Sequence, residues 1–91
     1  MAAKVKVRLF HELRSNIGQS EIELEANTLS EMLQSLINKH AGLRDLLYDS
    51  KGNIQRNILI YVNNVVQSPS EFSRKLNDGD LVLLIPPAAG G

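Results

Sequence analysis

The stretch that decides the fold is Asn77-Asp78-Gly79-Asp80-Leu81-Val82-Leu83-Leu84-Ile85-Pro86-Pro87-Ala88-Ala89-Gly90-Gly91. Its first four residues are typical of a turn, and five consecutive apolar residues follow them. Such a run predicts a strand that is buried on both faces, and a strand of this kind lies at the centre of a sheet. Two prolines then end the strand, because proline has no N–H to donate to a neighbouring strand.

Two strands with alternating apolar and charged residues are expected near the start of the chain, over residues 4–9 and 21–25. The charged residues of the first strand are basic and those of the second are acidic. Opposite charges favour the pairing of these strands, with residues 13–20 as a hairpin loop between them. The charged positions concerned are Lys4, Lys6, Arg8, Glu21, Glu23 and Glu25.

One helix is expected in the middle of the chain. Thr28 and Glu31 have the spacing of a capping box, and apolar residues recur after them with helical periodicity. The pattern predicts a helix over residues 29–41, with Gly42 just past its end. A short helical turn is expected over residues 43–48 and a turn over residues 49–53.

A second hairpin is expected after this helix. Residues 57–62 are strongly β-forming, and Asn63-Asn64 suits a tight turn into Val65-Val66. The order is therefore hairpin, helix, strand, tight turn and strand. A mixed sheet with the last strand beside the first, and one main helix across one face, satisfies this order. This α+β arrangement is the β-grasp, or ubiquitin-like, fold, with a domain over residues 1–87 and a flexible Gly-Gly tail over residues 88–91.

Composition excludes several classes of function. The chain has 91 residues, which suits one domain, and its ten basic and ten acidic residues argue against a nucleic-acid binder held by a positive field. It has no cysteine, which excludes disulfides and thiolate catalysis. Without a signal peptide or an apolar run long enough for a membrane span, we expect a cytoplasmic location and no membrane partner.

A self-contained catalytic or metal site is not expected either. The sequence contains no phosphate-binding loop and no dinucleotide-binding glycine motif. His11 and His40 have no potential metal ligands at a familiar spacing, so no metal site is predicted. The glutamates of the second strand are interpreted as a solvated face paired with the basic residues of the first.

The tail is the candidate functional segment. Pro86 and Pro87 restrict the backbone and project the chain away from the sheet. Ala88, Ala89, Gly90 and Gly91 have almost no side chain, so they can enter a narrow channel and bring the Gly91 carboxylate into a deep site. That carboxylate is unreactive until an ATP-using partner activates it. The other interpretation is an inert chain end.

An apolar patch is expected beside the root of this tail. Phe10 follows the outward parity of the first strand, and Leu83 and Ile85 face opposite to Val82 and Leu84. Val66 is a further member. Such patches mark docking sites for partner proteins. The other interpretation is a second small core covered by residues 43–56.

These residues resemble the MoaD/ThiS family of ubiquitin-like sulfur carrier proteins, which includes the small subunit of molybdopterin synthase. The likeness lies in the Asp78-Gly79-Asp80 turn, the apolar strand after it and the ending Ile85-Pro86-Pro87-Ala88-Ala89-Gly90-Gly91. Leu13-Arg14, Ile17-Gly18 and Tyr61-Val62-Asn63-Asn64 also match the family, so the resemblance covers nearly the whole chain.

The resemblance implies a mechanism and partners. An E1-like enzyme would use ATP and Mg²⁺ to adenylate Gly91, so this chain itself would bind no cofactor. A persulfide donor would convert the product into a thiocarboxylate, which donates sulfur within the large subunit of molybdopterin synthase or another sulfur-accepting enzyme. Phe10, Val66 and Ile85 match the family's docking patch, to which Leu83 is added from its parity, and Arg14 matches a basic residue near it. The chain would be a carrier or non-catalytic subunit.

Two departures leave the pathway open. Ile85 stands where the family often has phenylalanine, and residues 43–56 are longer than in the shortest molybdopterin carriers. The longer segment resembles carriers that deliver sulfur to amino-acid or siderophore synthesis, and delivery to thiamine synthesis is a further alternative. It is also similar to small archaeal-type modifiers that are conjugated to protein lysines, here through Gly91.

Overall fold

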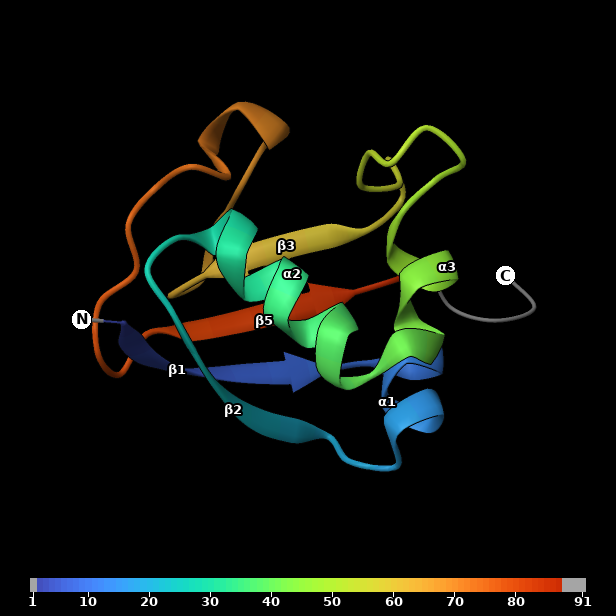
Figure 1. The fold of residues 1–91 in the computed structure, drawn as a ribbon, viewed down its shortest axis with the longest axis horizontal. Helices are drawn as coiled ribbons and strands as arrows, with labels where there is room; N and C mark the ends of the chain where they lie inside the picture. The colour runs from blue at the N-terminus through green and yellow to red at the C-terminus, as the bar shows by residue number, and fades with distance from the viewer. Residues whose placement is uncertain (1, 88–91) are drawn as a thin grey trace.

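A computed structural model describes residues 2–87 and gives a five-stranded mixed sheet with helices on one face (Figure 1). The predicted tail, residues 88–91, lies outside the described residues. The elements in chain order are β1 (Ala3–Leu9), α1 (His11–Ile17), β2 (Glu21–Ala26), α2 (Leu29–Lys39), η1 (Ala41–Leu43), α3 (Arg44–Leu47), β3 (Leu59–Val62), β4 (Val65–Val66), η2 (Pro69–Glu71) and β5 (Leu81–Ile85).

The last strand lies at the centre of the sheet, as its apolar sequence predicts. The strand order is β2-β1-β5-β3-β4, with β5 parallel to β1 and antiparallel to β3. Figure 1 shows β5, in red, between the blue β1 and the ochre β3. The β-grasp prediction is therefore confirmed.

The pairing of β1 with β2 brings opposite charges together, as expected. Lys4 lies opposite Glu25, Lys6 opposite Glu23 and Arg8 opposite Glu21 in the register of the two strands. Arg8 Nη2 is 3.0 Å from Glu21 Oε1. Because the charged side chains are exposed, they contribute little stability, about 0–1 kcal/mol for an ion pair of this kind.

The hairpin loop predicted over residues 13–20 is wrong, because most of this segment is the short helix α1. Leu13 is fully buried, which holds the helix against the body of the protein. Gly18 ends α1 with a φ of 82°, and its N–H donates to the Arg14 carbonyl at 2.8 Å. Glycine adopts this left-handed conformation without the strain that a Cβ would cause.

The capping box of α2 is confirmed. Thr28 Oγ1 accepts a hydrogen bond from the Glu31 N–H at 3.2 Å, and Glu31 Oε2 accepts one from the Thr28 N–H at 3.1 Å. These bonds satisfy donors that the first turn of a helix leaves free. They fix the point at which the chain turns from β2 into the helix.

The predicted end of this helix is wrong by two residues. Helix α2 ends at Lys39, and the His40 N–H donates to the Leu36 carbonyl at 2.9 Å. Gly42 lies inside η1 instead of capping α2. A Cβ built on Gly42 would lie 2.8 Å from Asn16 Oδ1, so the absence of a side chain lets η1 approach α1 closely.

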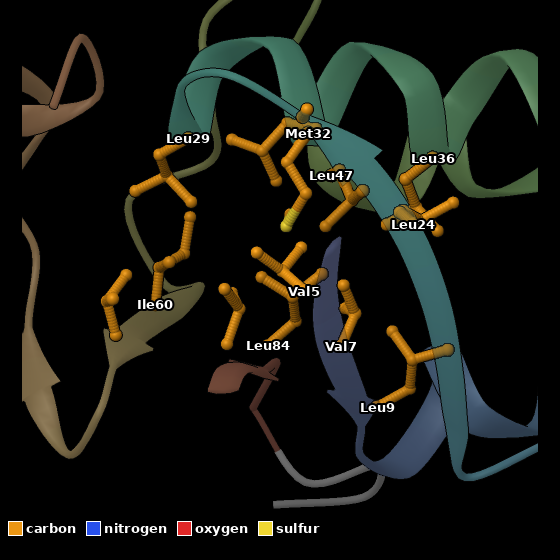
Figure 2. Packing of buried hydrophobic residues seen from close by; sticks show 14 of the residues in the cluster. Val5, Val7, Leu9, Leu24, Leu29, Met32, Leu36, Leu47, Ile60 and Leu84 are labelled. Atoms are coloured by element: carbon orange, nitrogen blue, oxygen red, sulfur yellow. The ribbon is translucent and has the colours of Figure 1, made fainter. Parts of the chain in front are cut away.

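The core lies between α2 and the inner face of the sheet. Figure 2 shows Met32 of α2 pointing toward Val5 and Leu84, with Leu47 of α3 beside it. All four side chains are at most 1% exposed. The predicted helical turn over residues 43–48 thus joins the main core through Leu47 and encloses one end of the sheet.

Candidate functional site

The start of β5 is held by a network of side chains from the β3–β4 turn. Asp80 Oδ1 accepts a hydrogen bond from Asn63 Nδ2 at 2.9 Å, and Asp80 Oδ2 accepts one from the Asn77 N–H at 2.8 Å. Asn63 Oδ1 in turn accepts from the Leu81 N–H at 3.0 Å. Asn63 and Asn64 have φ values of 51° and 71°, which confirms the tight turn. These bonds fix the register of the strand that leads to the tail.

The root of the tail lies in a shallow pocket. Pro86 is buried and Pro87 is exposed, and both line a cavity of about 140 Å³ at the end of the sheet. The first turn of α1 and the segment from α3 to β3 form the other walls. The remaining lining residues are Glu12, Leu13, Asp45, Leu46, Gln55, Asn57 and Ile58. The chain is therefore held in place up to the point where the predicted tail begins.

The outer face of the sheet, away from α2, carries an apolar patch next to this root. In the strand register Leu83 lies between Arg8 and Tyr61, Tyr61 lies opposite Val66, and Ile85 lies opposite Leu59. Leu59 is 46% exposed and Val66 is 52% exposed, while the other three apolar members are half-buried. We call this set the outer patch: Leu59, Tyr61, Val66, Leu83 and Ile85.

Phe10, between the end of β1 and the start of α1, extends the outer patch, whereas Arg14 forms no hydrogen bond or ion pair with the patch among the described residues. Leu9 lies opposite Leu84, and Phe10 has extended backbone angles of −125° and 153°. Its half-buried side chain therefore follows the outward parity next to Ile85. Arg14 is exposed on α1, and within residues 2–87 no hydrogen bond or ion pair ties its side chain to the sheet.

The interpretation of the patch as a second small core is wrong. Leu43 and Leu47, from the segment that would have covered it, are fully buried in the main core with α2. Residues 54–56 of that segment border a hollow together with Leu59 and Val66, but both of these side chains stay exposed.

Two members of the outer patch, Leu59 and Tyr61, were not predicted from the sequence. The run 57–62 is almost entirely apolar, so its composition does not show which residues face outward. The signal was present in its parity, because Ile58, Ile60 and Val62 are buried and the residues between them must face the other way.

Within residues 2–87 there is no group of three acidic or histidine side chains arranged for a metal ion. No helix in that range has the length and hydrophobicity needed to span a bilayer. We take the tail root and the outer patch beside it as the candidate functional site.

Comparison with known proteins gives a family and several solved structures. A family model described as the ThiS family matches residues 7–91. No curated protein matches the chain. The solution structure of small archaeal modifier protein 1 from Methanosarcina acetivorans is 28% identical, with a TM-score of 0.85 over 100% of this chain and 99% of that one.

Two further neighbours come from complexes. A chain of the Amycolatopsis orientalis BexX/CysO complex is 28% identical, with a TM-score of 0.79 over 96% of this chain and 99% of that one. A chain of the complex of subunits 1 and 2 of the molybdopterin-converting factor from Helicobacter pylori is 26% identical, with a TM-score of 0.63 over 97% and 99%.

Proposed function

Because the chain belongs to the ThiS family of ubiquitin-like proteins, which includes sulfur carriers, we propose that it carries sulfur on the carboxylate of Gly91. In this proposal it is a non-catalytic carrier or subunit, and an E1-like partner supplies the activation. The observation that supports it best is the path of the chain. A short tail of small residues leaves directly from the central strand, whose end is buried at Pro86.

The chemistry proceeds in three steps. The Gly91 carboxylate attacks the α-phosphate of ATP in the partner, which forms an acyl-adenylate and releases pyrophosphate. The terminal sulfur of a persulfide then attacks the acyl carbon, and AMP leaves with the electron pair of the broken bond. A second thiolate attacks the sulfur of the donor thiol in the resulting acyl disulfide. The bond to the acyl-bound sulfur breaks, the thiocarboxylate is released, and the attacking thiolate and the donor thiol remain joined as a disulfide.

The structure supports separate roles for this chain, which presents the tail, and for its partners, which activate it. The tail is presented from a strand that is paired on both sides, so its root has a fixed position for entry into a partner. The outer patch offers apolar surface beside that root, and an exposed apolar surface suits the docking of a partner enzyme. The chain has no phosphate-binding loop of its own, so ATP and Mg²⁺ belong to the activating partner.

The acceptor that we propose is the molybdopterin precursor, bound in the large subunit of molybdopterin synthase. Its support is the resemblance of the ending Pro86-Pro87-Ala88-Ala89-Gly90-Gly91 together with the likeness to a subunit of the Helicobacter pylori molybdopterin-converting factor complex. Sulfur delivery to amino-acid, thiamine or siderophore synthesis uses the same thiocarboxylate and differs only in the acceptor enzyme.

A second candidate function is conjugation of Gly91 to lysine side chains of other proteins. The specific observation that favours it is the high TM-score of 0.85 with a small archaeal modifier protein. Both functions begin with the same adenylate. They diverge at the nucleophile, which is a persulfide in one case and a lysine amine in the other.

The deciding measurement is the intact mass of the protein purified from its native cell without reductant or acid. The carrier function predicts a species heavier by the difference between one sulfur and one oxygen, localised to Gly91 by fragmentation. A matched chain that ends at Gly90 should remain unmodified. If the full chain also stays unmodified after incubation with ATP, Mg²⁺, a sulfur donor and native extract, the carrier proposal is wrong.

The same material separates the acceptors. Loss of molybdopterin on deletion of the gene, with recovery by the full chain and not by the chain ending at Gly90, supports the molybdopterin acceptor. Unchanged molybdopterin rejects it in favour of the other sulfur pathways. Gly-Gly remnants on lysines of other proteins, absent when the chain ends at Gly90, establish conjugation.

A further inference from the structure

The two edges of the sheet differ in how they are closed. The β4 edge has only two residues, and the Val65 carbonyl there accepts a hydrogen bond from Gln67 Nε2 at 2.9 Å. Arg74 Nη1 donates to Gln67 Oε1 at 3.3 Å, which holds this amide in place. With two residues, this edge offers little length for the addition of another strand.

The β2 edge is longer and has no cover. Strand β2 runs over six residues, Glu21–Ala26, and is the outermost strand on its side of the sheet. In Figure 1 it follows the lower border of the sheet, and no other described element lies beyond it. Its inner face packs on α2, but its edge faces outward.

The register shows which backbone groups this edge presents. The Leu9 N–H donates to the Ser20 carbonyl at 2.8 Å, which fixes the phase of the β1–β2 ladder. Hydrogen-bonded and non-hydrogen-bonded pairs alternate along an antiparallel ladder. The N–H and C=O groups of Glu21, Glu23 and Glu25 therefore point away from β1 and toward the open edge.

The side chains along this edge select the charge of an added strand. Glu21, Glu23 and Glu25 are exposed on the outer face, and among the described residues only Glu21 forms an ion pair, with Arg8. A residue paired with each glutamate by an added strand would place its side chain on the same face. Lysine or arginine at every second position of the added strand would lie opposite these carboxylates. The basic residues of β1 already have this arrangement on the other side of β2.

A hollow beside the edge accommodates the alternate residues. A cavity of about 340 Å³ lies between the end of β2 and α2. Its lining includes Glu25, Ala26, Gln34, Ser35 and Asn38, so it combines polar groups with apolar surface. Small polar side chains of an added strand, such as threonine or serine, suit this inner side.

We propose that the β2 edge is a docking site for an extended segment of another protein that carries lysine or arginine at every second position. A second copy of this chain does not fit, because edge-to-edge pairing of two β2 strands would place glutamates opposite one another. The site lies across β1 from β5 and the tail that follows it, and it is independent of Gly91 activation.

The test uses the full-length protein and a labelled probe peptide of alternating lysine and threonine. The matched control peptide has glutamate in place of every lysine. Binding measured by fluorescence anisotropy should favour the lysine peptide and weaken as the salt concentration rises. Amide exchange by NMR should show new protection at Glu21, Glu23 and Glu25, because their N–H groups gain partners.

Two variants separate strand addition from simple charge attraction. Glu23→Pro removes one outward N–H and no bond to β1, so the protein should fold and lose peptide binding. The double variant with Glu23→Gln and Glu25→Gln keeps the backbone groups and should weaken binding by about 2- to 30-fold, from two cross-strand charge pairs. Thermal unfolding checks that each variant is folded.

Several results would overturn the docking site. These are equal binding of the two peptides, protection that maps to other strands, or concentration-dependent dimers joined through β2. Unchanged affinity in both the Glu23→Pro protein and the double glutamine variant would do the same. If the proline variant fails to fold, the double variant and the exchange map still decide the question.

Discussion

The outer patch leads to a quantitative prediction about partner docking. Leu59 and Val66 are 46% and 52% exposed, so about half of each side chain remains to be buried by a partner. Full burial of such a side chain is worth about 1.5–3 kcal/mol, so half of it contributes about 0.7–1.6 kcal/mol for each residue. Changing both to serine should therefore weaken docking by a factor of about 10 to 150.

The neighbouring Val65 provides a matched control. It is 58% exposed and equally apolar, but it lies opposite the buried Val62 and so belongs to the other face of the sheet. Val65→Ser should leave docking unchanged. Each of these side chains is already about half buried in the folded protein. The double serine variant should therefore lose about 1.4–3 kcal/mol of stability and Val65→Ser about half as much, so docking is compared at a temperature where thermal unfolding shows all variants folded.

The assay is thiocarboxylate formation on Gly91 in native extract, followed by intact mass at several concentrations of the carrier. The double variant with Leu59→Ser and Val66→Ser should raise the concentration needed for half-maximal rate and leave the rate at saturation nearly unchanged. An equal effect of Val65→Ser, or no effect of the double variant, would refute the docking role of the outer patch.

Three further predictions concern stability. Met32→Ala removes a fully buried side chain between α2 and the sheet, so the free energy of unfolding should fall by about 2–5 kcal/mol in urea titration. Hydrogen bonds from the Ser68 N–H and hydroxyl lower the pKa of Glu71 in the folded protein. The stability that this carboxylate contributes is therefore present above pH 4.5 and is lost as the pH falls through the folded pKa. In Glu71→Gln, the melting temperature should depend less on pH in this acid range. Burial raises the pKa of Tyr48, and the charge of Arg44 opposes part of this rise. The free energy of unfolding should therefore fall as the pH rises above 10.0, because the unfolded chain ionises Tyr48 first. Tyr48→Phe should remove this contribution to the pH dependence of stability.

Most of the fold followed from residue patterns because local and long-range signals agreed. The alternation of residues 4–9 and 21–25, the capping box at Thr28 and the fully apolar last strand each specify one place in the sheet. The short helix α1 was missed because seven residues carry too few periodic positions. A single buried leucine, Leu13, holds it in place, and that contact is tertiary.

The candidate site was predictable where parity could be counted and unpredictable where it could not. Phe10, Leu83 and Ile85 follow strands whose buried residues alternate, so their outward direction could be derived. Leu59 and Tyr61 lie in a nearly continuous apolar run, so the face of the sheet on which they lie could not be read from composition. The pocket around Pro86 joins segments that are distant in sequence, which no local pattern encodes.

The central position of β5 also has a consequence for how the protein folds. Its partner β1 begins the chain, with Lys6 paired to Leu81, so the parallel ladder must close a loop that includes almost every other element. Contacts of such long sequence separation form slowly, whereas the β1–β2 hairpin forms from nearby residues. During synthesis the side of β1 that awaits β5 is thus an open strand edge. Lys4, Lys6 and Arg8 of β1 keep that edge charged, which opposes self-association until β5 pairs with it.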